Sequence, residues 1–348
     1  MKEPFRVGLT RDFLKADGGL GFGDIGLDVL DGAQDVVWEF LAEDTRELRA
    51  DQVREYDAIA VLAPRVTATT LEGAERLALV ARYGVGYDSV DVEACTRQGV
   101  LLSITPDGIR RPMAGVILTY LLALSHRLLE KDRLTRAGGW ADKLDYIGVG
   151  LTGRVLGSIG LGNIGRELFA LVRPLEMRHI AHDPYVSPEQ AEALGVELVG
   201  LEALLRTADF VTVNCALTEE THHLLNAERL ALMKPTSYLI STARGPIVDQ
   251  RALTEALRER RIAGAGLDVF EWEPVDPNDP ILGLDNVIVS PHSLCWTDEW
   301  AYITGRSACQ AIVEVAAGRV PKYVVNREAI DTALVRAKLD RYAHRLEG

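Results

Sequence analysis

The sequence predicts an α/β protein of two domains, and three observations lead to this prediction. The chain has 348 residues, a length that suits about two domains. Short apolar runs rich in branched residues alternate with helical patterns, which is typical of parallel sheets covered by helices on both faces. One strand-to-helix junction carries glycines at G-x-G-x-x-G spacing, the turn that opens a dinucleotide-binding fold.

The first third of the chain predicts a small open sheet. Strands are expected at 6–10, 58–62, 77–81 and 100–104, with a helix at 92–98 and a helical or mixed segment up to residue 42. A long apolar helix over 112–129 begins with a proline, which is tolerated in the first turn of a helix. Residues 130–153 are polar and rich in glycine, and we expect an arm there.

A second, larger sheet follows the arm. Its expected strands are 155–160, 179–182, 210–214, 238–241, 265–269 and 287–289. Six strands are enough for a complete dinucleotide-binding fold, whereas the first sheet is too short for one. A helix at 300–317, an extended stretch at 323–326 and a charged helix complete the chain.

The glycines of the junction are Gly160, Gly162 and Gly165, and each has a mechanical role. One makes the tight turn, one lets the backbone approach a pyrophosphate, and one lets helix and strand pack closely. The same spacing recurs at 21–26, where no strand precedes it, so that copy is expected to be a loop.

An acidic residue follows at the position that such a fold needs. Asp183 lies 18 residues beyond Gly165 and accepts the hydroxyls of an adenosine ribose in this interpretation. Residues 184–186 contain no arginine or lysine for a 2′-phosphate, so NAD is favoured over NADP. A purely structural glycine-rich turn is the alternative.

Composition and charge narrow the function classes. The formal net charge is −13, spread along the chain, which argues against nucleic acid and anionic membranes as partners. The four cysteines are widely spaced, so we expect reduced thiols and no metal site. The N-terminus lacks an apolar signal core and the apolar run 113–124 is too short to span a bilayer, so a cytoplasmic protein is expected.

Two polar residues follow predicted strands of the second sheet, at the edge where such sheets bind ligands. Arg244 comes just after strand 238–241 and has the geometry to hold a carboxylate bidentately. Asp268 follows strand 265–267 and could accept a hydrogen bond from a nicotinamide. A surface or capping arginine, and a helix-capping aspartate, remain the structural alternatives.

His292 and Glu273 form a second candidate pair. A histidine donates a proton to a carbonyl oxygen as hydride arrives, and takes it back in the reverse direction. A carboxylate on its other nitrogen fixes the tautomer and favours the protonated ring. A lone histidine after a proline is often structural, and sequence spacing alone does not bring Glu273 to it.

Together these residues resemble the D-2-hydroxyacid dehydrogenase family over nearly the whole chain. The matching motifs are RYGVGYDSVD (82–91), TPDG (105–108), GSIGLGNIGRELF (157–169), HDPY (182–185), CALTEETHHLLN (215–226), MKPTSYLISTARGPIVD (233–249), GAGLDVFEWEP (264–274) and NVIVSPH (286–292).

The resemblance implies an arrangement of domains and partners. A Rossmann-type NAD-binding domain (112–296) is inserted into a smaller flavodoxin-like substrate domain (1–111 and 297–348). A homodimer is implied, with helix 112–129 and arm 130–150 at the interface. The reaction is hydride transfer between nicotinamide and C2 of a D-2-hydroxy acid or 2-oxo acid.

The resemblance also implies roles for individual residues. Arg244 binds the substrate carboxylate, His292 is the acid/base and Glu273 its partner, while the backbone of Val85 and Gly86 helps to hold the carboxylate. The expected cofactor-binding residues are Gly160, Gly162, Asn163, Ile164 and Gly165 around the pyrophosphate, Asp183 at the ribose, and Cys215, Ala216, Leu217, Thr242, Ala243 and Asp268 at the nicotinamide half.

Two departures from the family pattern leave the substrate open. Leu294 and Trp296 are bulky where small residues are usual, and they either reshape a pocket wall or pack against the following helix. Arg110 and Arg111 either bind a distal carboxylate or phosphate of the substrate, or lie in solvent or at the dimer interface.

Three rival functions follow from the same motifs. A phosphoglycerate-type dehydrogenase would use Arg110 or Arg111 to bind the phosphate. A formate-type dehydrogenase is disfavoured, because such enzymes carry glutamine where this chain has Glu273. An NADH-sensing scaffold of the same fold keeps the Arg244, Glu273 and His292 set, so that set does not exclude it.

Overall fold

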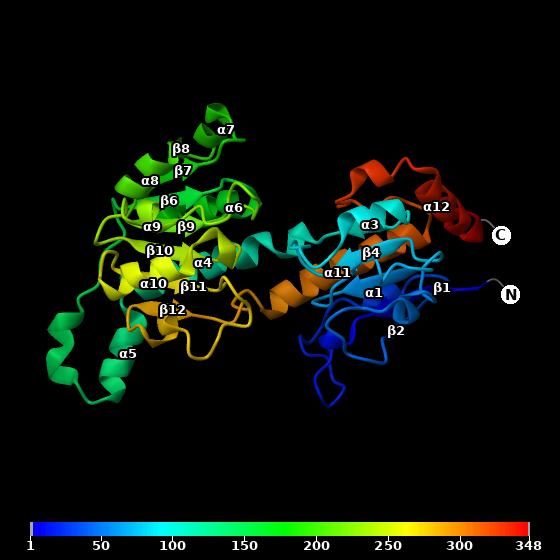
Figure 1. Ribbon diagram of the computed structural model, residues 1–348, viewed down its shortest axis with the longest axis horizontal. Coiled ribbons are helices and arrows are strands. Elements are labelled where there is room, and N and C mark those ends of the chain that lie inside the picture. The colour runs from blue at the N-terminus through cyan, green and yellow to red at the C-terminus, as the bar shows by residue number, and fades with distance from the viewer. Residues whose placement is uncertain (1–2, 347–348) are drawn as a thin grey trace. The chain divides into compact units, whose positions relative to one another are not determined.

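The computed structural model describes residues 3–346 and divides the chain into two compact units (Figure 1). Unit 1 comprises Met1–Ile109 and Trp296–Gly348, and unit 2 comprises Arg110–Cys295. Each unit has its own parallel β-sheet. The predicted α/β class is therefore confirmed.

Unit 1 contains a five-stranded parallel sheet in the order β2-β1-β3-β4-β5. Its strands are β1 Phe5–Leu9, β2 Val36–Phe40, β3 Ala58–Val61, β4 Leu79–Arg82 and β5 Leu101–Ser103. The three strands β3, β4 and β5 are buried along almost their whole length, as the apolar runs predicted. The segment up to residue 42, expected to be helical or mixed, ends in strand β2, whose half-buried and exposed residues alternate as at a sheet edge.

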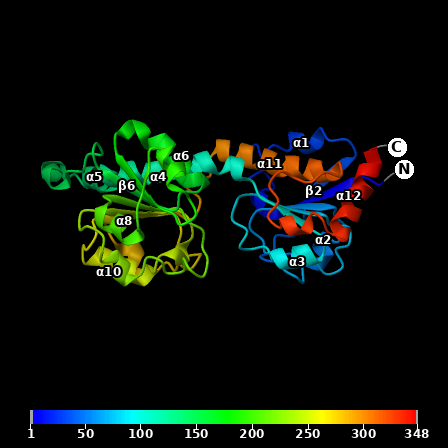
Figure 2. The same cartoon turned by 90° about the horizontal axis from the view of Figure 1, so that it is seen from above.

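Helices cover both faces of this sheet (Figure 2). Helices α1 and α11 lie on one face, and α2 and α3 lie on the other. The helices of unit 1 are α1 Asp28–Asp31, α2 Ala50–Val53, α3 Val92–Arg97, α11 Asp298–Ala316 and α12 Ala333–Leu346. Segment 21–26 is a loop without a strand before it, as expected.

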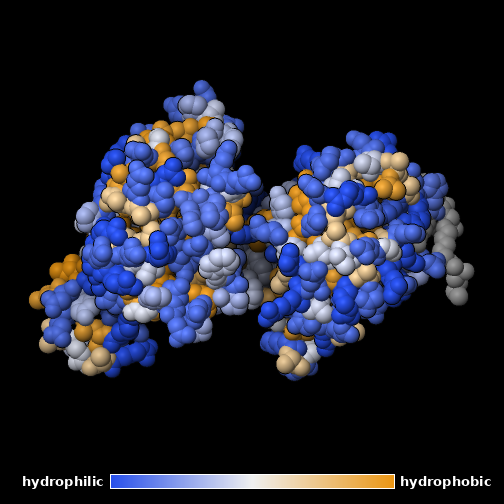
Figure 3. All heavy atoms as spheres, viewed as in Figure 1, coloured by the Kyte–Doolittle hydropathy of each residue, from blue (hydrophilic) through white to orange (hydrophobic). Residues whose placement is uncertain are grey.

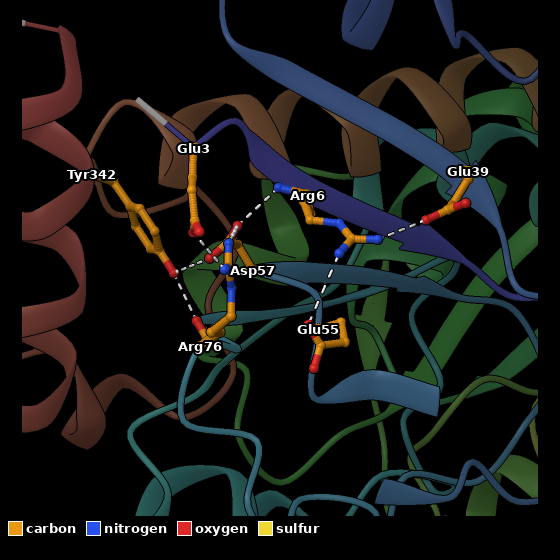
Figure 4. A network of polar contacts seen from close by, with 7 residues as sticks. All are labelled: Glu3, Arg6, Glu39, Glu55, Asp57, Arg76 and Tyr342. Carbon is orange, nitrogen blue, oxygen red and sulfur yellow. Dashed lines mark hydrogen bonds and ion pairs between the residues drawn. The ribbon is translucent and has the colours of Figure 1, made fainter. Parts of the chain in front are cut away.

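A buried carboxylate ties the last helix to the first strands of unit 1 (Figure 4). Asp57 is fully buried and accepts hydrogen bonds from the Arg6 backbone (2.8 Å), the Arg76 guanidinium (2.9 Å) and the Tyr342 hydroxyl (3.0 Å). Tyr342 lies in α12, so these hydrogen bonds attach the last helix to the sheet of unit 1.

Unit 2 contains a seven-stranded parallel sheet in the order β12-β11-β10-β9-β6-β7-β8. Its strands are β6 Val155–Ile159, β7 Arg178–His182, β8 Glu197–Leu198, β9 Phe210–Val213, β10 Tyr238–Ser241, β11 Gly264–Leu267 and β12 Val287–Val289. The six predicted strands are present. The seventh, β8, is a two-residue edge strand with no apolar run to reveal it.

The helices of unit 2 flank its sheet (Figure 2). They are α4 Arg110–Ser125, α5 Leu128–Arg136, α6 Asn163–Val172, α7 Pro188–Glu192, α8 Leu201–Thr207, α9 Ala227–Leu230 and α10 Gln250–Arg258. Helices α4 and α6 lie on one face, and α8 and α10 lie on the other.

The single helix predicted over 112–129 is in fact two helices. Helix α4 ends at Ser125 and α5 begins at Leu128, with Arg127 in the left-handed region at φ +52°. A left-handed residue breaks the α-helical hydrogen-bond ladder, and the local sequence carries no glycine or proline that would announce it. An arm formed by α5 and the 3₁₀ segment Trp140–Tyr146 follows.

No single helix among residues 3–346 is long and apolar enough to cross a membrane. The pair 106–125 and 128–136, bent by 55°, meets the length and composition criteria only when its two helices are taken together.

Candidate active site

The carboxyl ends of the seven strands of unit 2 bring the predicted residues to one edge. All of these strands run parallel, so their last residues share that edge. Predicted site residues come after six of the strands: Gly160 after β6, Asp183 after β7, Cys215 after β9, Thr242–Arg244 after β10, Asp268 after β11 and His292 after β12.

The glycine turn between β6 and α6 has the geometry of a phosphate cradle. Gly160 has φ +97°, and a Cβ there would lie 2.8 Å from the backbone of Asn214 and Cys215. A Cβ on Gly165 would lie 2.8 Å from the carbonyl oxygen of Gly160. A Cβ on Gly162, directly before the first residue of α6, would meet nothing within 4 Å.

These three environments correspond to a tight turn, close helix packing and an open approach. Gly162 leaves room where the first N–H groups of the ten-residue helix α6 and its dipole favour an anion. The residues present therefore fit the pyrophosphate of a dinucleotide, with Asn163 and Ile164 opening the helix.

Asp183 is held beside this turn by two backbone groups. Its Oδ2 accepts a hydrogen bond from the Leu161 N–H (2.8 Å), and its Oδ1 accepts one from the Tyr185 N–H (2.9 Å). An ionised carboxylate offers about four acceptor positions. Two positions therefore remain for the hydroxyls of a ribose, and a 2′-phosphate would meet a like charge.

The loops after β9 and β10 supply the remaining predicted cofactor residues. Cys215 lies against Gly160, and burial raises the pKa of its thiol to about 11, so it stays a neutral, mostly apolar side chain. Ala216 accepts a hydrogen bond from the Thr221 hydroxyl (2.7 Å). Thr242 is buried, and the Ala243 carbonyl accepts from Arg244 Nη1 (2.7 Å).

A glycine allows the loop that carries Arg244 to pack directly against the loop that carries Glu273. A Cβ on Gly245 would lie only 1.7 Å from the carbonyl oxygen of Phe270. Only glycine permits this approach, and the adjoining Arg244 side chain is thereby kept close enough to Glu273 to lower its pKa.

His292 and Glu273 are paired, which sequence spacing alone did not establish. Nδ1 of His292 lies 2.7 Å from Oε2 of Glu273, and Glu273 Oε1 accepts from the Phe270 N–H (3.0 Å). The pair is partly open to solvent, with 44% of the His292 side chain and 37% of the Glu273 side chain exposed. Nε2 of His292 makes no hydrogen bond to the described residues and is available to a substrate.

The pKa of Glu273 is lowered, although its burial works in the opposite direction. Burial is the largest single influence and raises the pKa. The hydrogen bonds from His292 and the Phe270 N–H, with the charges of His292 and Arg244, together outweigh it. Glu273 therefore stays ionised at neutral pH.

Asp268 does not cap a helix. Its Oδ1 accepts from the Ser290 hydroxyl (2.5 Å), the Ser293 N–H (3.1 Å) and the Leu294 N–H (3.3 Å). The buried carboxylate thus holds the turn that carries His292. Tyr120 and Ser290 belong to the same network, and the sequence contained no signal for either of them.

The candidate residues Val85 and Gly86 belong to unit 1, where they follow β4. The preceding Gly84 has φ +133°, and its N–H donates to the Thr105 hydroxyl (2.8 Å). Val85 and Gly86 are half-buried.

The two arginines at the start of α4 differ in their surroundings. Both are exposed, and Nη1 of Arg111 lies 3.2 Å from Oε1 of Glu167 in α6. This ion pair joins the start of α4 to α6 within unit 2.

Trp296 packs against the helix that follows it. Its ring stacks on Trp300 of α11 (centroids 5.7 Å apart) and meets Phe22 edge to face (5.0 Å). This contact supports the packing alternative for Trp296, although about half of its side chain is exposed. Leu294 is also partly exposed.

Neither a metal site nor a disulfide is found in the described part of the chain. Residues 3–346 contain no group of three or more His, Cys, Asp or Glu side chains that could hold a metal ion. The four cysteines, Cys95, Cys215, Cys295 and Cys309, are unpaired thiols.

Comparison with known families finds a match over half of the chain. Residues 118–293 match the model of the D-isomer specific 2-hydroxyacid dehydrogenase NAD-binding domain. A glyoxylate reductase of Thermococcus onnurineus is 38% identical over 302 residues, which are 85% of this chain and 90% of that protein. A glyoxylate reductase of Aeropyrum pernix is 36% identical over 338 residues, covering 95% and 98%.

Solved structures agree with these matches. The TT0316 protein of Thermus thermophilus is 31% identical, with a TM-score of 0.79 over 92% of this chain and 99% of that one. The D-lactate dehydrogenase of Aquifex aeolicus, solved with NAD and lactic acid, is 25% identical, with a TM-score of 0.79 and the same coverage.

Proposed function

Because the chain belongs to the D-isomer specific 2-hydroxyacid dehydrogenase family, an NAD-binding family of oxidoreductases, we propose that it interconverts a 2-oxo acid and a D-2-hydroxy acid. The observation that carries this proposal is the His292–Glu273 pair, 2.7 Å apart, at the same sheet edge as the glycine cradle. A dinucleotide site and a proton donor together are what reduction of a carbonyl requires.

In the reductive direction the roles are as follows. The glycine turn and Asp183 would hold NADH, which would supply the hydride for C2 of the 2-oxo acid. Arg244 binds the carboxylate and polarises the carbonyl, and protonated His292 gives the proton from Nε2 to the carbonyl oxygen. Glu273 holds the ring through Nδ1 and stabilises its positive charge.

We propose NADH as the preferred coenzyme and glyoxylate as one of the substrates. Asp183 disfavours a 2′-phosphate, and the three residues after it bring no cation. The relatives of 35–38% identity bear the name glyoxylate reductase. The phosphoglycerate-type alternative needs Arg110 or Arg111 to bind a phosphate, and Arg111 would have to leave its exposed ion pair with Glu167 to do so.

We further propose that the chain acts in the cytoplasm as a homodimer whose interface includes α4 and the arm. Large apolar side chains on the arm are exposed, which is typical of a surface that another chain covers (Figure 3).

The test is oxidation of NADH with a panel of 2-oxo acids: glyoxylate, pyruvate, hydroxypyruvate, an aromatic, a dicarboxylic and a phosphorylated acid. We expect NADH to be preferred to NADPH. His292→Ala should lower kcat by about 100-fold to 10,000-fold, the range for a lost general acid, with NADH binding unchanged.

Other outcomes separate the alternatives. A loss confined to phosphorylated or dicarboxylic acids in Arg110→Ala would favour the phosphoglycerate-type reaction. Tight NADH binding without reduction of any acid would contradict the proposal and favour the sensing scaffold.

A further inference from the structure

We propose that Tyr120, acting through Ser290 and Asp268, is a positioning residue for His292. The inference deepens the proposed function and rests on it, because it concerns how the acid/base group is held for proton transfer. All of the residues involved lie in unit 2.

The turn that carries His292 needs to be held in place. His292 has φ +52°, a left-handed conformation that a residue with a side chain adopts only at an energetic cost. Its own N–H donates to the Ser290 carbonyl (3.1 Å). Oδ1 of Asp268 then binds the turn on both sides of the histidine, at Ser290 before it and at Ser293 and Leu294 after it.

The hydrogens of this network have one consistent direction. An ionised carboxylate only accepts, so the Ser290 hydroxyl donates its hydrogen to Asp268. The Ser290 oxygen is then an acceptor, and the Tyr120 hydroxyl 2.5 Å away is its donor. The same hydroxyl also donates to the Leu267 carbonyl, 3.0 Å away, so its single hydrogen is shared between these two acceptors.

The position of the Tyr120 ring depends on Gly266, which leaves room for it. A Cβ on Gly266 of β11 would lie 2.5 Å from Cδ1 of Tyr120, so the ring lies directly across the strand. Tyr120 is about 1% exposed, and its burial raises the pKa of the hydroxyl. The group therefore keeps its proton and remains a donor throughout the physiological pH range.

The consequence is a constraint on the angle at which His292 meets Glu273. Their bond is 2.7 Å long and lies at the partly exposed surface, so packing contributes little to its alignment. Without the Tyr120 hydrogen bond, the Ser290 hydroxyl oxygen loses its only donor among the described residues. A small shift of this turn lowers the rate of proton transfer more than it weakens binding.

The experiment compares Tyr120→Phe with Tyr238→Phe as a matched control. Tyr238 is a half-buried tyrosine of β10, stacked on Phe210 at 5.2 Å. We expect Tyr120→Phe to lower kcat about 5-fold to 10-fold, with KM and the NADH Kd within about twofold of the parent. The alkaline limb of the kcat–pH profile should move to lower pH, because Glu273 then supports the protonated ring less well.

A double variant tests the order of the network. Tyr120→Phe combined with Ser290→Ala should lose no more activity than Ser290→Ala alone, because both changes interrupt one path. Equal kcat and pH profiles in Tyr120→Phe and the parent, or the same loss in Tyr238→Phe, would overturn the proposal.

A second readout keeps the inference separate from the reaction assignment. The ring Hε1 signal of His292 is identified in the NMR spectrum by its absence in His292→Gln. It should move in Tyr120→Phe while the signals of the other histidines stay in place. Absence of turnover in the parent chain would refute the proposed function alone, whereas an unmoved His292 signal would refute the positioning role.

Discussion

At the scale of single residues, the charge of Glu273 links stability to pH. Its pKa is lowered from the ordinary 4.5, so near that pH the unfolded chain binds more protons than the folded one. The stabilisation is fully present above pH 4.5 and is lost as the pH falls through the folded pKa. We therefore expect the free energy of unfolding of the parent to decline more steeply below this pH than that of Glu273→Gln.

Urea unfolding between pH 3 and 7 measures this difference. Glu192→Gln is a suitable control, because Glu192 is exposed on α7 and makes no described ion pair. Parallel pH curves for the parent and Glu273→Gln would contradict the assignment of the lowered pKa to the His292 and Arg244 contacts.

A second residue, Gly245, has no room for a side chain. Alanine there would place its Cβ 1.7 Å from the Phe270 carbonyl, and backbone must move to relieve the clash. We expect Gly245→Ala to destabilise unit 2 by at least about 3 kcal/mol in urea unfolding, the upper range for overpacking. Gly150→Ala, where nothing lies within 4 Å, should change stability by less than about 0.5 kcal/mol.

At the scale of helices and strands, the elements that could be predicted are those marked by hydrophobic periodicity or by a motif. The buried strands of both sheets and the glycine turn were predictable because long apolar runs and a fixed spacing mark them. Strand β8 was not predictable, because its two residues form no apolar run, and β2 was missed because its segment was expected to be helical or mixed. The break at Arg127 has no local breaker residue and was also missed.

In the candidate site, too, some features were predictable from the sequence and others were not. Residues at strand ends were found by position, but their contacts join segments far apart in the sequence. Tyr120 lies 170 residues from Ser290, and no pattern in α4 distinguishes it from a core aromatic residue. Sequence reasoning considered Asp268 as a ligand or a cap, whereas its hydrogen bonds hold the turn after β12.

Helix α12 provides a prediction at this scale through Lys338. The side chain is buried, its Nζ donates to the carbonyls of Leu77 (2.7 Å) and Gln98 (2.9 Å), and burial lowers its pKa to about 8. Between pH 8 and the ordinary 10.5 the unfolded chain binds more protons than the folded one. Lys338 therefore contributes a stability that rises with pH over this window.

The variant Lys338→Met should lack this rise, so the parent minus variant difference in unfolding free energy should increase from pH 8 to pH 10. The comparison uses the difference between parent and variant because a second group titrates in this pH range. Burial raises the pKa of Cys95 to about 12, so its titration lowers the free energy of unfolding as the pH rises. Lys322→Met, at an exposed lysine paired with Asp107, is the control. A flat difference would show that the pKa of Lys338 is not lowered in the folded chain, because the folded and unfolded states would then bind equal numbers of protons.

At the scale of the whole molecule, the exposed arm predicts the assembly. Leu144 and Ile147 are each more than 70% exposed and Trp140 is 69% exposed, on the arm that follows α4. Figure 3 shows hydrophobic atoms at the surface of this end of unit 2. An apolar surface of this kind is unfavourable in water and is covered by association. In a symmetric dimer each copy presents the same patch to its partner, so a single change acts twice.

We expect the parent to have the mass of two chains in light scattering at micromolar concentration. The variant Leu144→Asp/Ile147→Asp should have the mass of one chain, because four carboxylates would be buried at the interface without partners.

Val37→Asp, at an exposed apolar position on β2 of unit 1, should remain dimeric. A parent of single-chain mass, or a dimeric double variant, would refute the arm as the interface. NADH binding to the glycine turn should survive in the monomer, because every residue of that turn belongs to one unit.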